Sequence, residues 1–99
     1  MSPEDYEKGR AILKEMLGEK ADAAAESIRE MAPDFEEMVM SFVMSDLYGR
    51  EGLDLKTRLL CTIAALTVMG RQAQLAVHVD RAIGAGASAE EIREVILQM

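Results

Sequence analysis

The feature that most constrains this chain is a run of eleven residues, Leu59 to Met69, which contains nothing more polar than one cysteine and two threonines. A helix built from such a run is apolar on every side, so we expect it to be buried on every side. The run is well short of the ~20 apolar residues that cross a bilayer. The N-terminus, which begins MSPEDYEKGR, has no apolar signal region either. We therefore expect a soluble, cytoplasmic protein with no membrane partner.

The rest of the chain divides at helix-start and helix-stop signals into helices with short connections. Capping residues at Ser2, Asp54 and Ser88 precede apolar residues at helical spacing, and glycines follow several of the same segments. Alternation typical of strands is absent from the sequence. We expect an all-α fold of five to six helices in a single domain, residues 1–99. The expected helices span residues 3–17, 21–31, 34–48, 55–69, 71–85 and 89–99.

The composition limits the kinds of partner that this domain can bind. The net charge of −7 repels phosphate backbones, so we expect no nucleic-acid partner. Cys61 is the sole cysteine, which excludes an internal disulfide or a thiolate metal cluster within one chain and fits a reducing compartment. We expect Cys61 to behave as a small buried hydrophobe. Ninety-nine residues with eight methionines make a small, adaptable core, so we expect a homo-oligomer to complete its burial.

The polar side chains best suited to catalysis or ligand binding lie on the helix expected at residues 71–85. Arg71, Gln74, His78 and Arg81 fall within roughly 80° of one another on that helix. An imidazole, two guanidinium groups and an amide on one stripe form a candidate site for a small anion. A structural histidine bonded to a carbonyl, on an ordinary solvated stripe, is the alternative interpretation. Arg81 in particular is expected to pair with a surface glutamate. We also expect the acidic pairs Glu36–Glu37 and Glu90–Glu91 to be solvated.

Five segments in order resemble one protein family. They read YEKGRAILKEMLG, APDFEEMVMSFVMSDLYGREG, LDLKTRLLCTIAAL, QLAVHVDRAIGAG and SAEEIREVILQM. Together they resemble the carboxymuconolactone decarboxylase family, which shares the AhpD-like helical fold with AhpD-type alkylhydroperoxidases. The peroxidase branch uses a Cys-x-x-Cys pair and an upstream glutamate, but Arg71, Gln74 and Leu59 occupy those positions here. Without a dithiol, disulfide exchange is excluded.

The resemblance implies a cofactor-free, metal-free decarboxylase acting on a small carboxylate, a carboxylated lactone similar to 4-carboxymuconolactone. On that reading His78 is the catalytic acid or base, and the substrate-binding candidates are Arg71, Gln74, Arg58 and Tyr48. Structural roles for Arg58 and Tyr48, each at a helix end, are the alternatives. Relatives assemble as oligomers, so a dimer, trimer or hexamer is expected.

Relatives also continue into one more helix, which is missing here because the sequence ends at Met99; we expect either that the chain is truncated there or that this protein has lost the helix. The alternative function is therefore a non-catalytic oligomerisation scaffold that keeps only the fold.

Overall fold

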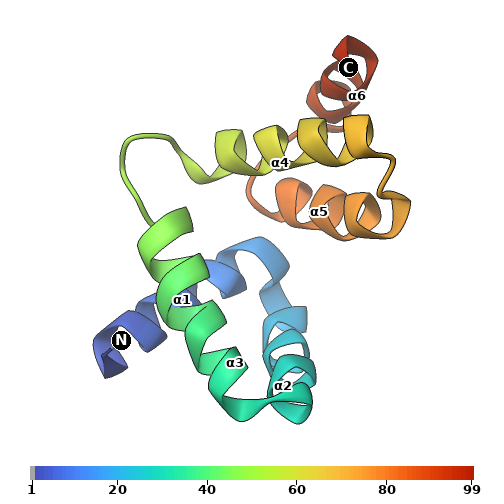
Figure 1. Ribbon diagram of the computed structural model, residues 1–99. Helices are drawn as coiled ribbons and strands as arrows, with labels where there is room; N and C mark the ends of the chain where they lie inside the picture. The colour runs from blue at the N-terminus through green and yellow to red at the C-terminus, as the bar shows by residue number, and fades with distance from the viewer. Residues whose placement is uncertain (1) are drawn as a thin grey trace. The chain divides into compact units, whose positions relative to one another are not determined.

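The computed structural model describes residues 2–99, which form helices joined by short turns and loops, with no strand among those residues (Figure 1). The chain forms two compact units, Met1–Gly52 and Leu53–Met99. The all-α class predicted from the sequence is confirmed. No helix described between residues 2 and 99 is long and apolar enough to cross a membrane.

The first unit begins with α1 (Pro3–Leu17), whose start is fixed by a reciprocal cap. The Ser2 hydroxyl accepts from the Asp5 backbone N–H at 3.1 Å, and the Asp5 carboxylate accepts from the Ser2 N–H at 3.3 Å. Gly18 then ends the helix at a φ of +57°, a conformation that glycine adopts without strain. Both ends of α1 are therefore set by local sequence.

After α1 the chain continues through a short 3₁₀ turn, η1 (Gly18–Lys20), into α2 (Ala21–Met31). Ala32 is extended because a proline disfavours helical geometry in the residue that precedes it. Pro33 then opens α3 (Pro33–Met38), which runs directly into η2 (Val39–Tyr48). The expected boundaries of these helices are confirmed to within a residue or two.

The second half of the helix predicted at residues 34–48 differs from expectation, because η2 is a π-helix. Its hydrogen bonds span five residues, so each turn takes in more chain than an α-helical turn. Two adjacent rows, Met40 with Met44 and Ser41 with Ser45, are buried along it. Helix α1 packs along η2, and Gly9 lies against the Met40 carbonyl. The core of this unit joins the buried residues of three elements: Leu13, Met16, Ala21, Ala25, Met40 and Met44.

The second unit is built from α4 (Leu55–Met69), α5 (Gln72–Gly84) and α6 (Ala89–Gln98). Asp54 caps α4 by accepting from the Thr57 N–H at 3.1 Å, and Gly70 ends it at a φ of +70°. The predicted Ser88–Glu91 capping box opens α6. Helix α4 packs against both α5 and α6. The buried apolar residues of the second unit come from all three helices and the turn before α6: Leu59, Ile63, Ala82, Ala87 and Ile92.

The expectation that the central helix is buried on every side is wrong for this chain. Only Leu59 and Ile63 of α4 are buried, while Val68 and Met69 are 69% and 62% exposed. Cys61 is exposed as well, so its predicted role as a buried hydrophobe is also wrong. The physical reason is that two helices, α5 and α6, can cover only part of the circumference of a third. The uncovered part stays apolar.

Candidate functional site

The candidate site lies on α5, where the predicted stripe runs from exposed to half-buried positions. Arg71 is the residue before α5, and it is exposed like Gln74. His78 and Arg81 are half-buried, and Ala82 next to them is fully buried. Residues three and four apart on a helix are neighbours, so α5 itself brings Gln74, His78 and Arg81 together. The stripe therefore leads from solvent toward the packed side of the unit.

The imidazole of His78 is held by its own helix. Its Nδ1 lies 2.9 Å from the Gln74 carbonyl oxygen. Because a carbonyl can only accept, Nδ1 must carry the proton in this contact. The other ring nitrogen, Nε2, then holds the lone pair of the neutral ring and becomes the donor when the ring is protonated. The carbonyl contact expected of a structural histidine is present, and it also fixes which nitrogen could exchange a proton with a ligand.

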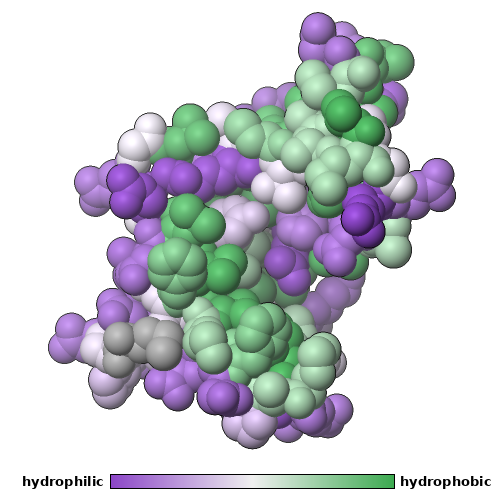
Figure 2. Space-filling model, in the orientation of Figure 1, coloured by the Kyte–Doolittle hydropathy of each residue, from purple (hydrophilic) through white to green (hydrophobic). Residues whose placement is uncertain are grey.

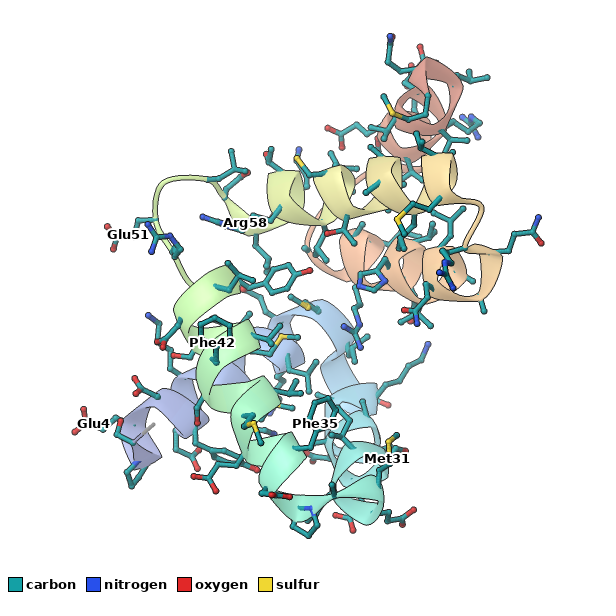
Figure 3. All side chains as sticks on the ribbon, viewed as in Figure 1. Glu4, Met31, Phe35, Phe42, Glu51 and Arg58 are labelled. Carbon is teal, nitrogen blue, oxygen red and sulfur yellow. The ribbon has the colours of Figure 1, made fainter. Side chains whose placement is uncertain are left out.

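The other two predicted binding residues lie outside α5. The Arg58 Nε donates to the Leu53 carbonyl at 3.0 Å, which ties its side chain to the turn that precedes α4 (Figure 3). Tyr48 closes η2 in the first unit and is half-buried. The contact of Arg58 supports a structural role at the helix start. The roles of the five predicted residues in catalysis and substrate binding stay predictions.

A groove of about 430 Å³ in the second unit lies between α4 and α6 rather than on the His78 stripe. Its wall is mainly apolar and includes Leu60, Cys61 and Ala64 from α4 with Val95 from α6. Lys56 and Glu91 join the same two helices, with Nζ and Oε2 3.0 Å apart. This groove accounts for the exposure of Cys61.

The first unit contains a polar cluster that the sequence analysis did not predict. The Glu36 side chain is only 3% exposed, so the expectation of a solvated Glu36 is wrong. The Tyr6 hydroxyl lies 2.9 and 2.7 Å from its two carboxylate oxygens, and Arg29 Nη2 donates to Oε1 at 3.2 Å. The Tyr6 oxygen also accepts from Arg29 at 3.0 Å and from Arg10 at 3.4 Å. Burial of Glu36 is tolerated because these donors compensate its charge.

A local signal for this burial does exist in the sequence. Glu36 lies four residues before Met40 and eight before Met44, so it continues the row of α3 and η2 that faces the core. Its partner Tyr6 is thirty residues away, and no local pattern pairs the two. An open cavity of about 450 Å³ adjoins the cluster and is walled by Pro3, Tyr6, Arg29, Pro33 and Glu36 with neighbouring glutamates.

Hydrogen bonds shift the pKa values of four groups in the two units. A hydrogen bond to Tyr6 raises the pKa of Arg10, and one to Glu36 raises the pKa of Arg29. Hydrogen bonds from Thr57 lower the pKa of Asp54. The Ser88 backbone N–H, followed by Lys56, lowers the pKa of Glu91. Each shift favours the charged form, as expected for groups that cap helices or bind an opposite charge.

Among residues 2–99, no three His, Cys, Asp or Glu side chains gather closely enough to hold a metal ion. By their own chemistry, the imidazole, amide and guanidinium groups of the α5 stripe are suited to proton transfer and to hydrogen bonding with an anion or a carbonyl.

Comparison with known proteins gives a matching family model and similar relatives. The model of the carboxymuconolactone decarboxylase family matches residues 33–99. The chain is 32% identical over 93 residues to the 4-carboxymuconolactone decarboxylase of Acinetobacter baylyi, an alignment that covers 93% of this chain and 69% of that protein. It is 41% identical over 75 residues to an uncharacterized 15.0 kDa protein of Paracoccus denitrificans from the nqo9-nqo10 intergenic region. That alignment covers 74% of this chain and 56% of the relative.

Proposed function

Since the chain belongs to the carboxymuconolactone decarboxylase family, we propose that it is a cofactor-free decarboxylase, or a related enzyme, acting on a carboxylated lactone similar to 4-carboxymuconolactone. The observation that carries this proposal is the geometry of His78. Its Nδ1–H is held by the Gln74 carbonyl, which leaves Nε2 available for a ligand. One relative named for this reaction aligns over nearly the whole chain.

In the proposed reaction the bond between the lactone ring and its carboxylate breaks, and carbon dioxide leaves. The electron pair moves through the conjugated double bond into the lactone carbonyl and forms a dienolate. This electron sink lies within the substrate, so no cofactor is required. Protonated His78 then gives its Nε2 proton to a carbon of the dienolate, and the neutral ring keeps the Nδ1–H···Gln74 contact. The Nδ1–H contact with the Gln74 carbonyl is therefore present both before and after proton transfer.

The remaining roles follow the chemistry of the side chains. Arg71, exposed at the start of α5, is proposed to receive a substrate carboxylate with its planar guanidinium group. The Gln74 side-chain amide is proposed to donate to the lactone carbonyl as negative charge develops there. Arg58 and Tyr48 are proposed as further substrate-binding residues, although the contact of Arg58 with Leu53 equally serves the fold.

The test is a steady-state assay of 4-carboxymuconolactone loss with the wild-type protein and His78→Ala. We expect His78→Ala to lower kcat by about 10²–10⁴-fold, which is the usual contribution of a general acid or base. Arg93→Ala, an exposed arginine of α6, is the matched control and should retain activity. Undiminished turnover in His78→Ala would refute the role of His78, and the absence of turnover in the wild type would refute the substrate.

A second candidate function, a non-catalytic oligomerisation scaffold, is favoured by exposed apolar side chains. Met31, Phe35 and Phe42 of the first unit are 78%, 46% and 57% exposed, and Figure 3 labels all three side chains. Hydrophobic side chains also gather on the visible surface in Figure 2. For either function we propose that the protein is a homo-oligomer that buries part of this surface. We also propose that it is located in the cytoplasm. Sedimentation velocity tests the assembly, and an oligomer without lactone turnover would favour the scaffold.

A further inference from the structure

Arg81 has an unmet hydrogen-bonding requirement in the second unit. Its Nε is buried and has no hydrogen-bond partner. Arg10 Nε shares this property, but the terminal nitrogens of Arg10 bind Tyr6 and Asp22. Arg81 forms no ion pair within the part of the chain that the structure describes, so the predicted pairing with a surface carboxylate is not found there.

A buried N–H of a charged group that lacks an acceptor is costly, and native structures keep few of them. Nε itself is closed to solvent, but the terminal nitrogens of Arg81 are not among the buried unpaired atoms, so a ligand can bring an acceptor to them and compensate the charge of the group. The guanidinium fork matches the two oxygens of a carboxylate, which is the group that the proposed substrate class carries. The chemistry of the missing partner is therefore that of a small organic anion.

Arg81 lies three residues after His78 on the same helix, so its unpaired guanidinium group is close to His78. Three residues along a helix correspond to a rise of about 4.5 Å on the same face, whereas Arg71 is about 10.5 Å along the axis from His78. His78 and Arg81 are both half-buried, while Arg71 is exposed. A lactone carrying a short carboxylate arm can span the separation between His78 and Arg81.

We propose that Arg81 is a substrate-binding residue that holds the carboxylate retained by the substrate while His78 acts on the ring. This inference rests on the proposed function and refines it. Arg81 cannot usefully hold the departing carboxylate, because stabilising that charge favours the ground state over the transition state. Arg71 is left to receive the anion at the exposed end of α5.

The proposal has a consequence for the unliganded protein. If Arg81 is kept for ligand binding, it does not stabilise the free fold, and its removal relieves a buried unpaired donor. Arg81→Met should therefore unfold at the same temperature as the wild type or at a higher one. A structural arginine would behave in the opposite way.

The experiment combines thermal unfolding, succinate titration and kinetics on Arg81→Met, with Arg93→Met as the matched control. Succinate, a small dicarboxylate, should raise the melting temperature of the wild type and of Arg93→Met but not of Arg81→Met. With 4-carboxymuconolactone, Arg81→Met should raise KM by about tenfold to a hundredfold, because a charge-assisted hydrogen bond is lost, and change kcat far less. Arg81→Lys, which keeps the charge but not the fork, should fall between the two.

Three outcomes would overturn the proposal. These are a lowered melting temperature for unliganded Arg81→Met, an unchanged succinate response, or an unchanged KM. If the wild type does not turn over the lactone but its succinate response depends on Arg81, the anion-binding role stands and the proposed reaction alone fails.

Discussion

The buried cluster around Glu36 makes Tyr6→Phe the most informative single substitution for the first unit. The change removes only the hydroxyl and leaves the aromatic ring in place. The Glu36 Oε2 atom then loses the donor that lies 2.7 Å away, while Oε1 keeps its contact with Arg29 at 3.2 Å. Because Glu36 is 3% exposed, water has little access to replace the lost bond.

The expected cost follows from these contacts. Hydrogen bonds to charged groups contribute about 1.5–3 kcal/mol, and the loss here leaves a buried carboxylate under-satisfied. Arg10 and Arg29 also lose an acceptor, but both are partly exposed, so water can compensate for them. We therefore expect Tyr6→Phe to lower the free energy of unfolding by about 2 kcal/mol. For a chain of this size each kcal/mol shifts the melting temperature by roughly 4–8 °C.

Urea unfolding followed by circular dichroism measures this change. Tyr48→Phe is the matched control, because Tyr48 is a half-buried tyrosine of the same unit outside the cluster. The control should stay within about 0.5 kcal/mol of the wild type. A double-mutant cycle of Tyr6→Phe with Glu36→Gln should give a coupling of about 1–2 kcal/mol. Equal stability of Tyr6→Phe and Tyr48→Phe would refute the importance of the cluster.

Two further substitutions test the remaining structural reasoning. The Ser88 N–H and Lys56 hold the pKa of Glu91 below its ordinary value of 4.5, so its stabilising contribution is present above that value and is lost as the pH falls through the folded pKa. Glu91→Gln should flatten the acid side of the stability–pH profile, measured as the urea midpoint at successive pH values, and an unchanged profile would contradict this. Gly9→Ala places a methyl group into the Met40 carbonyl and should cost about 1–3 kcal/mol in the same assay, whereas Gly52→Ala meets open space. Equal midpoints for these two variants would show that α1 does not approach η2 this closely.

Local sequence determined most of the secondary structure of this protein. The Ser2, Asp54 and Ser88 caps and the stops at Gly18 and Gly70 act over a few residues, so they can be interpreted without knowledge of the fold. The stripe of Arg71, Gln74, His78 and Arg81 is likewise a property of one helix. Its angular grouping follows from helical spacing alone. These features were predictable because their causes lie within a turn or two of the chain.

The tertiary structure decided which of these residues are buried and what they contact. Glu36 belongs to an acidic pair that looks solvated, yet it is buried because Tyr6, thirty residues away, and Arg29 on the preceding helix supply its donors. The apolar run of α4 looks like a fully buried core helix, yet only Leu59 and Ile63 along it are buried. Arg81 looks ready to pair with a surface carboxylate, yet its Nε is buried without an acceptor. Pairing depends on elements far apart in the chain, and periodicity, although it places Glu36 in the buried row of Met40 and Met44, does not say which residues pair.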